Sequence, residues 1–410
     1  LADAASKPRA LCSWLRRFWN LPMHVARLSL SLAAALALSA PLSFDAQATS
    51  PIMSEGNNGV SAAAMKQADI LREAALHDET AWHVLESLTT EVGPRVAGSE
   101  ADARAVTWMV AKFKALGFDK VWTEPVTFPK WVRRSESAAI VGASAQPLHV
   151  TALGGSAGGI VTGEIVRFAT LAELEAAPAG SLTGKIAFLD YRMERMKDGS
   201  GYGPGSRGRS RGPSAAIRAG ASAYLMRSVG TDDHRNPHTG MTRYDEGLTP
   251  APAAAVSNPD ADQLARLLKR GAVQVKLALD CGWDGEYTSQ NVIAEIRGRG
   301  KPDEVVGIGG HLDSWDLGTG AIDDGAGCAI IAAAAKNVAR AGQPLRTIRV
   351  LFAGAEETGL FGSAAYSKAH INELIAVGLE SDFGADRIWR FDSNFRTTNP
   401  ELHQKIALAV

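Results

Sequence analysis

The sequence has few cysteines, almost no net charge and no apolar run long enough to cross a membrane. Its 410 residues include 3 cysteines, and 43 Lys and Arg balance 44 Asp and Glu to a formal net charge of -1. Three scattered cysteines (Cys12, Cys281 and Cys328) exclude a disulfide framework and a metal cluster of cysteines. Any metal must therefore be bound by His, Asp and Glu, and the balanced charge argues against nucleic acid as a partner.

Residues 1–48 are typical of a leader with an export signal. A short basic segment at residues 23–27 precedes an apolar stretch at 28–40, and Ala46-Gln47-Ala48 matches a signal-peptidase site. We expect cleavage after Ala48 and a secreted or periplasmic protein, in which Cys281 and Cys328 either pair or stay buried. The apolar stretch is too short to span a bilayer, so no permanent membrane anchor is expected.

The remaining chain divides by pattern into three stretches. The first, at 49–134, has helical spacing from Ser61 on, with Ser99 as the expected N-cap of one helix and Gly117 at its end, followed by a predicted strand at 121–128. Residues 135–283 are rich in glycine, proline and short β-like runs, and we expect an inserted domain there. Residues 284–410 alternate strands and helices, which predicts an α/β sheet covered by helices.

The middle stretch contains a glycine- and arginine-rich segment at residues 199–212. Alone, this composition would indicate an RNA-binding tract or a linker. A predicted helix at 213–219 and a predicted strand at 221–227 follow directly. We therefore expect the segment to form an ordered surface loop.

Histidine and acidic side chains follow the predicted strands of the last stretch. The strand 304–310 leads into His311-Leu312-Asp313, and alternate residues of an extended chain point the same way. This spacing makes His311 a candidate metal ligand, with Asp313 as the neighbour that fixes its tautomer. The pair alone is weak evidence, because such a spacing often arises by chance.

Further acidic residues occur at three positions along the same stretch. Asp323 and Asp324 precede a predicted helix, and we expect Asp323 to face a metal while Asp324 caps the helix. Glu356 and Glu357 follow one apolar strand and Asp382 follows another, at the sheet edge where α/β enzymes place their sites. Each alone would be an ordinary cap, turn residue or solvated pair. Their order and shared position at strand ends favour a two-metal hydrolytic centre.

These motifs resemble the co-catalytic zinc exopeptidases of peptidase family M28, and within it the carboxypeptidase Q branch. The likeness is carried by the run from His311 to Gly327 and by the Glu356-Glu357 and Asp382 motifs, and it extends to residues 92–98, 124–131 and 238–240. The resemblance implies a phosphorylase/hydrolase-like mixed α/β sheet covered by helices. It also implies that residues 135–283 are an inserted, β-rich protease-associated (PA) domain, between an N-terminal part (49–134) and the catalytic part (284–410) of the peptidase domain.

The resemblance also implies a role for each site residue. His311 and Asp382 would bind one Zn²⁺, Glu357 would bind a second, and Asp323 would bridge the two. Glu356 would be the general base. We count Asp313 with it as a catalytic residue because of its expected role beside His311. The implied substrate is a dipeptide or short peptide, with aminopeptidase, carboxypeptidase and dipeptidase activity all open. A homodimer is also open.

One feature of the family pattern is not matched. The pattern includes a further His ligand of the second zinc, well beyond the position of Asp382, and His403 is the only later histidine. Because His403 lies in an ordinary helix start, we do not expect it to be that ligand. The sequence is therefore expected to lack the ligand and part of the sheet, and to bind the second zinc weakly.

Two other functions compete with the peptidase. The first is a catalytically silent binding protein that uses the PA-like domain as an interaction surface. The second is an acyl-transferring or cyclising enzyme on the same scaffold, against which the PA-like insertion argues. The presence of the candidate ligands His311, Asp323, Glu357 and Asp382 together with Glu356 favours the peptidase. His238 is a candidate substrate contact at the rim of the site.

Overall fold

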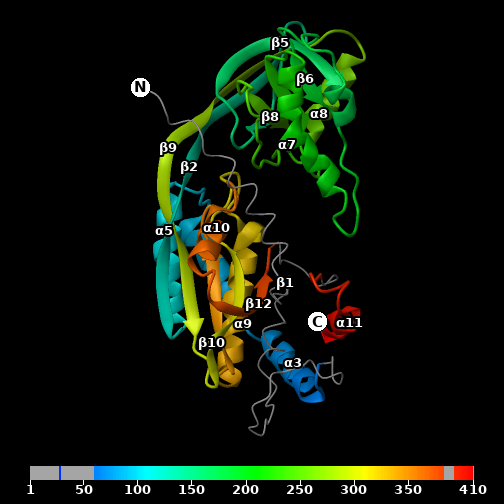
Figure 1. Ribbon diagram of the computed structural model, residues 1–410. Coiled ribbons are helices and arrows are strands. Elements are labelled where there is room, and N and C mark those ends of the chain that lie inside the picture. Colours follow the sequence, from blue (N-terminus) through cyan, green and yellow to red (C-terminus); the bar gives the residue numbers. More distant parts are fainter. Residues whose placement is uncertain (1–26, 29–59, 383–391, 410) are drawn as a thin grey trace.

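The computed structural model describes residues 27–28, 60–382 and 392–409 (Figure 1). The predicted leader lies outside these residues, apart from the two-residue strand β1 (Arg27–Leu28), which pairs in parallel with β12 (Leu374–Glu380). Within the described ranges, no helix has the length and apolar character that a membrane span requires. Below, residues 135–283 are called the middle module and the other described residues the main module.

One mixed sheet runs through both modules. In the described chain its strand order is β1-β12-β10-β11-β9-β5-β6-β7-β8-β4, and β2 pairs with β9 and β3. In the main module, β10 (Lys301–His311) lies between β11 (Arg346–Ala353) and β12, and both neighbours run parallel to it. β9 (Gln274–Ile296) runs antiparallel to β11. The mixed α/β fold predicted from the sequence is confirmed.

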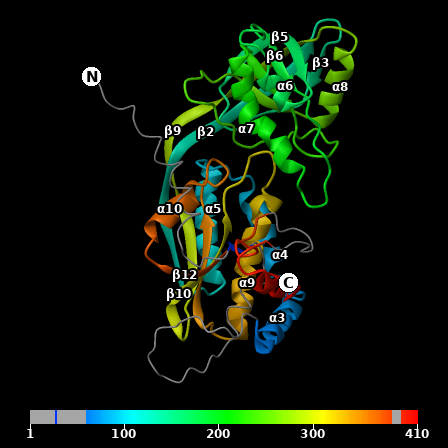
Figure 2. The same cartoon turned by 45° about the vertical axis from the view of Figure 1, so that its right-hand side comes forward.

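Two long strands connect the modules. β2 (Lys120–Val141) pairs with β9 in antiparallel register from Lys120 opposite Glu295 to Val141 opposite Gln274. Figures 1 and 2 show both strands running from the main module into the middle module. Both strands therefore continue through the positions 134–135 and 283–284, where the composition changes, although their register shifts between Arg133 and Ser135.

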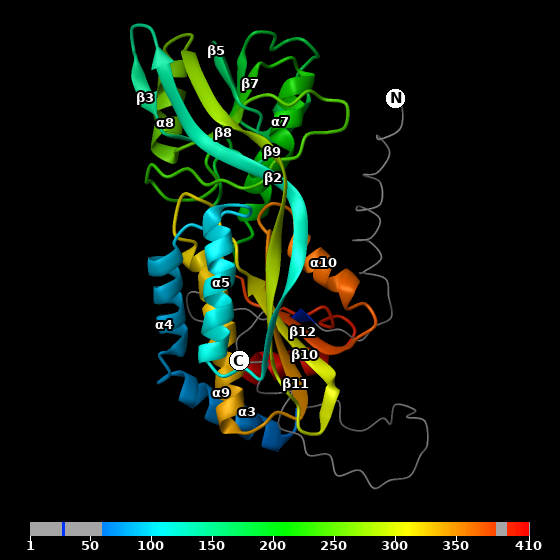
Figure 3. The same cartoon turned by 90° about the vertical axis from the view of Figure 1, so that its left-hand side faces the viewer.

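Helices cover both faces of the main-module sheet. In Figure 3 one face is covered by α3 (Ala62–Ala75), α4 (Thr80–Ser87), α5 (Glu100–Ala115) and α9 (Gly327–Ala341). α10 (Phe361–Ala369) covers the other face, and α11 (Pro400–Ala409) contacts α3. Ser99 caps α5 as expected, its hydroxyl accepting a hydrogen bond from the backbone N–H of Asp102 at 3.2 Å. Phe113 of α5 is fully buried and stacks on Phe352 of β11.

In the middle module the same sheet continues with mostly short strands. The elements of this module are β3 (Gln146–Leu148), β4 (Val150–Ala152), β5 (Gly159–Phe168), α6 (Leu171–Glu175), β6 (Ile186–Leu189), α7 (Tyr202–Arg218), β7 (Ala223–Arg227), β8 (Ala253–Val256) and α8 (Asn258–Leu268). The parallel strands β6 to β8 are nearly all apolar and buried, which is typical of strands covered on both faces.

Residues 202–212 of the glycine- and arginine-rich segment lie in helix α7, so the prediction of a surface loop at residues 199–212 is wrong for all but its first three residues. Gly205, Gly208 and Gly212 recur every three or four residues and are buried on one helix face. A Cβ atom at Gly212 would overlap the hydroxyl of Tyr224, which itself donates a hydrogen bond to the carbonyl of Gly208 at 2.8 Å. The glycines therefore let the helix approach β7 closely, and this packing outweighs their poor helix propensity.

Cys281 and Cys328, which could either pair or stay buried, are both buried free thiols. Cys281 lies in β9, and its thiol is 3.7 Å from the carbonyl of Ser156. Cys328 lies in α9, and its thiol donates to the carbonyl of His311 at 3.1 Å.

Asp102 provides a test of the packing between α5 and β9. Its carboxylate accepts hydrogen bonds from the N–H of Gly98 at 2.9 Å and the hydroxyl of Ser289 at 2.8 Å, and burial raises its pKa to about 6. Between about pH 4 and 6, the Asp102 carboxyl group is therefore largely protonated in the folded protein and largely ionised in the unfolded chain. Stability should fall as the pH rises from about 4 to 6, by at most about 1.4 kcal/mol per pH unit from this group.

Chemical denaturation between pH 4 and 7 measures this contribution when the wild type is compared with Asp102→Asn. The amide has nearly the same shape and keeps one acceptor and one donor for Gly98 and Ser289. As the pH rises, the unfolding free energy of the wild type should fall relative to that of the variant. A difference that is constant over this range would contradict the raised pKa.

Candidate metal centre

The candidate site residues lie at the carboxyl ends of three neighbouring strands. His311 is the last residue of β10, Glu356 and Glu357 follow β11, and Asp382 follows β12. Because these strands are parallel, their carboxyl ends meet at one edge of the sheet. Asp323 comes from η2 (Ala321–Ala326), which leads into α9. The sheet thus brings together residues that are far apart in the chain.

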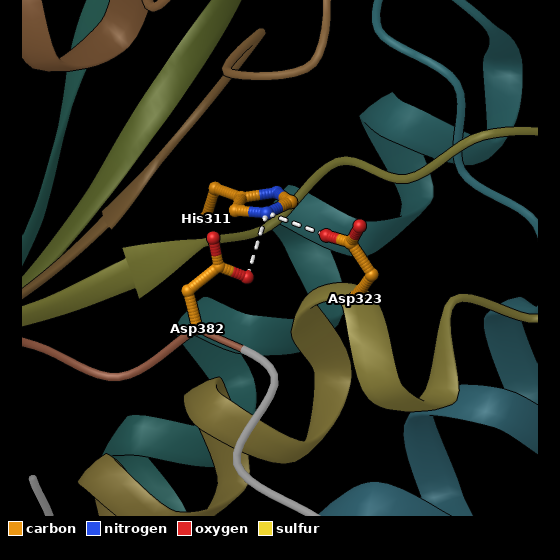
Figure 4. Close-up of side chains that lie close together, drawn as sticks. All are labelled: His311, Asp323 and Asp382. Carbon is orange, nitrogen blue, oxygen red and sulfur yellow. Dashed lines mark hydrogen bonds and ion pairs between the residues drawn. The ribbon is translucent and has the colours of Figure 1, made fainter. Parts of the chain in front are cut away.

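His311, Asp323 and Asp382 form the closest group (Figure 4). The His311 Nε2 atom is 3.0 Å from Asp323 Oδ1 and 3.8 Å from Asp382 Oδ1. One ligand atom from each residue lies within 4.8 Å of the others, so all three could contact one ion. The His311 side chain is 3% exposed, whereas those of Asp323 and Asp382 are 38% and 35% exposed. The group is therefore closed on the side of the sheet and accessible from the other.

Asp313 connects the histidine to the glutamate pair. Its buried carboxylate accepts the backbone N–H groups of Glu356 at 2.9 Å and Glu357 at 3.2 Å. The His311 Nδ1 atom is 3.0 Å from the backbone carbonyl of Asp313 and 3.8 Å from its carboxylate. A neutral His311 that donates from Nδ1 to this carbonyl keeps the Nε2 lone pair for a metal. The predicted contact between the two residues is present, but the hydrogen bond uses the carbonyl.

Asp324 does not cap α9, so that prediction is wrong. The N-cap position is Ala326, and no side chain caps this helix. The fully buried Asp324 carboxylate instead accepts the backbone N–H of His311 at 3.0 Å. Gly310 and Gly327 leave room for it, since a Cβ atom at either position would overlap a carboxylate oxygen. Asp324 thereby joins η2 to the end of β10.

Arg95 holds the loop between His311 and Asp323, a role that the sequence did not reveal. The guanidinium is fully buried and donates to the carbonyls of Leu312, Thr319 and Gly320. It also lies within electrostatic reach of the nearby aspartates. The only sequence signal was the position of Arg95 within the motif at residues 92–98.

The site brings several carboxyl groups close together where water has little access. Burial, together with the neighbouring carboxylates, raises the pKa of Glu356 to about 7, of Asp324 to about 8 and of Glu357 to about 9. Although burial opposes it, Asp323 and the other carboxylates raise the pKa of His311 well above its ordinary value. Partly buried carboxylates at this density are costly unless a cation neutralises them. Imidazole nitrogen with carboxylate oxygens is a donor set that suits Zn²⁺, so the residues fit this metal.

Two further predicted residues lie around this group. The Glu357 Oε2 atom accepts a hydrogen bond from the indole N–H of Trp315 at 2.6 Å.

His238, in the middle module, is 3.0 Å from the hydroxyl of Tyr202 and 3.1 Å from Arg209. Desolvation and Arg209 lower the pKa of His238 to about 4 and Asp323 opposes this shift, so His238 lies within electrostatic reach of the site. A substrate contact by His238 remains a prediction.

His403, the one histidine beyond Asp382, lies in α11. Its Nδ1 atom is 2.9 Å from the hydroxyl of Ser393, and its ring packs edge-on against Phe395. Within the described residues, His403 is not part of the group that could hold a metal.

The fold and the site define an α/β protein with a histidine–carboxylate centre at the carboxyl edge of a mixed sheet. The sequence profile of peptidase family M28 matches residues 291–409. The crystal structure of a peptidase M28 precursor from Shewanella amazonensis SB2B is 52% identical, with a TM-score of 0.78 over 79% of this chain and 75% of that chain. This chain belongs to peptidase family M28.

Other relatives carry more specific names. Carboxypeptidase Q from Bos taurus is 34% identical over 306 residues, which cover 72% of this chain and 63% of the bovine protein. A probable leucine aminopeptidase 2 from Aspergillus fumigatus is 29% identical over 69% of this chain and 51% of that protein. An aminopeptidase from Aneurinibacillus sp. strain AM-1 shares the fold, with a TM-score of 0.51 and 22% identity over 74% of this chain and 70% of that chain. The chain thus spans less than two thirds of the length of the curated relatives.

Proposed function

We propose that this protein is a secreted or periplasmic zinc exopeptidase that hydrolyses dipeptides or short peptides. The observation that carries the proposal is the convergence of His311, Asp323 and Asp382 at the carboxyl ends of parallel strands. Family M28 membership and the relatives named carboxypeptidase and aminopeptidase support the reaction class. Residues 135–283 would be the PA-like inserted domain, and the signal at residues 1–48 would direct export.

Two zinc ions are proposed, held by the residues of the centre. His311 and Asp382 would bind one ion, Glu357 the other, and Asp323 both. Bound zinc supplies Lewis acidity, which polarises a carbonyl group and lowers the pKa of water from ~15.7 towards ~7. The hydrogen bond between His311 Nδ1 and the Asp313 carbonyl orients the imidazole for this role.

Glu356 is the proposed general base. Its Oε2 atom is 3.9 Å from His311 Nε2, so its carboxylate borders the group without being one of the three clustered ligands. Its backbone N–H is fixed by Asp313, which holds the start of the side chain in place. From this position the carboxylate can accept a proton from the attacking water and return it to the leaving amine.

Metal removal tests the proposal directly. The purified full-length protein should hydrolyse members of a dipeptide panel, lose this activity when zinc is removed by a chelator, and regain it when zinc is returned. Blocking either terminus of the active dipeptides then decides between aminopeptidase and carboxypeptidase. Activity that survives complete metal removal would overturn the proposal. Zinc binding without hydrolysis of any peptide would instead favour a silent binding protein.

Asp313→Asn tests the support of the centre. The amide offers one acceptor oxygen where the carboxylate offers two, so one of the N–H groups of Glu356 and Glu357 loses its partner. We expect zinc affinity to fall by about 10- to 100-fold, the range typical for outer partners of metal ligands. Competition with a chromogenic chelator measures it. Zinc affinity equal to that of the wild type would show that Asp313 does not support the ligands.

A further inference from the structure

The loop between His311 and Asp323 is held by the middle module as well as by the main module. Arg133 of β2 donates to the carboxylate of Asp316 at 2.7 Å. The same guanidinium donates to the carbonyl of Ala152 at 2.9 Å and to the hydroxyl of Thr239 at 3.1 Å. Because the Arg133 side chain is only 6% exposed, the three contacts form in a place with little water. Through Arg133, the loop is thus tied to Ala152 of β4 and to Thr239.

Trp315, the neighbour of Asp316, is inserted into the middle module. Its ring packs against a hydrophobic cluster of that module and meets Trp131 edge to face, with ring centroids 6.3 Å apart. Gly154 lies against the far side of the indole, where a Cβ atom would overlap Trp315 Cη2. The absence of a side chain at position 154 therefore leaves the space that the indole fills.

The other end of the same indole reaches the metal centre. Its N–H group donates to Glu357 Oε2 at 2.6 Å. Because a carboxylate can accept several hydrogen bonds, the second oxygen of Glu357 stays available for a cation. A donor on a rigid, packed ring is the kind of outer partner that orients a metal ligand. One side chain thus connects Gly154 with Glu357, which lies far along the chain.

We propose that Trp315 is a positioning residue for Glu357. The place of its ring is set by Gly154 and the apolar cluster of the middle module, together with Trp131 and Arg133 of β2, which directly precede that module. The inference rests on the proposed function, in which Glu357 is a zinc ligand. It extends that function by making the middle module a structural part of the metal centre.

Trp315→Phe separates this role from simple packing. Phenylalanine keeps an aromatic ring in the slot but removes the N–H donor and the Cζ2 and Cη2 atoms. We expect the second equivalent of zinc to bind about 10- to 100-fold more weakly, with an unchanged circular dichroism spectrum. Addition of zinc to the wild type should also change the tryptophan emission, and Trp315→Phe should lose this change. Trp283→Phe is the matched control, because Trp283 lies in the middle module and is 53% exposed.

Gly154→Ala tests the contribution of the middle module. The added methyl group should displace the indole and weaken zinc binding, although position 154 has no contact with a proposed ligand. In a Trp315→Phe background the same substitution should weaken zinc binding less, because phenylalanine lacks the two indole atoms that the added methyl group would meet and only the overlap with Met241 Sδ is left. Gly203→Ala is the control, since a Cβ atom there meets nothing within 4 Å.

The outcomes distinguish this inference from the proposed function. If the wild type binds no zinc, the proposed function fails and the inference fails with it. If the wild type binds one equivalent of zinc and no second, only the inference is overturned, because Glu357 then holds no zinc. If the wild type binds zinc and Trp315→Phe binds it within about twofold of the same affinity, with the same change in emission, only the inference is overturned. Additive effects of the two substitutions would likewise overturn the link through Gly154, and Trp315→Phe decides the main claim even if Gly154→Ala does not fold.

Discussion

Glu356→Gln should lower kcat for peptide hydrolysis by about 10²- to 10⁴-fold, the usual contribution of a general base. The amide has almost the shape of the carboxylate but takes up no proton at neutral pH. Zinc content should stay at the wild-type level, because Glu356 lies beside the clustered ligands and is not one of them. Steady-state kinetics on one dipeptide, with zinc measured on the same sample, provides both numbers.

The control for this substitution is Glu286→Gln. Glu286 is exposed in β9, so the same chemical change there should leave kcat within about twofold of the wild type. A Glu356→Gln protein that retains about a tenth or more of the wild-type turnover would show that another group accepts the proton. A parallel loss of zinc and turnover would instead assign Glu356 to the ligands.

His311→Ala should abolish high-affinity zinc binding, with a loss greater than the roughly 10- to 100-fold typical of outer partners. His311 offers the only imidazole nitrogen in the candidate group, and its Nε2 atom faces both Asp323 and Asp382. The remaining ligands are oxygens, which suit zinc less well than a mixed set with nitrogen. Zinc affinity follows from competition with a chelator, independently of activity.

His403→Ala is the matched control, since it removes the one histidine that follows the centre in the chain. His403 hydrogen-bonds with Ser393 and has no place in the candidate group, so its loss should leave zinc affinity unchanged. Equal losses in the two variants would show that His403 is a ligand after all. Unchanged binding in His311→Ala would remove the basis of the proposed centre.

The sequence predicted that the candidate residues lie at strand ends, because local patterns determine where strands end. The apolar runs before His311, Glu356 and Asp382 have the composition of buried parallel strands, and all three became neighbouring strands with a common edge. The cap at Ser99 was predictable for the same reason, since capping involves only residues a few positions apart. Nothing in these patterns depends on distant parts of the chain.

The features that the sequence did not reveal depend on tertiary contacts. The helical state of α7 results from the fit of its glycines against Tyr224, which no local propensity contains. Asp324 had the ordinary pattern of a helix cap, and its contact with the backbone of His311 exists only after β10 and η2 have come together. Arg95 and Trp315 similarly act on carbonyl and carboxylate groups far away in the chain.

The long pairing of β2 with β9 affects the order in which the protein can fold. The pairing extends to Val141 opposite Gln274, so the two strands can pair only after the chain between them has been synthesised and compacted. During synthesis, the 22 residues of β2 and the 23 residues of β9 leave the ribosome before His311 does. The slot for Trp315 can therefore form before the indole that fills it has been synthesised. Folding during synthesis would then build this support of the candidate metal centre before its proposed ligands.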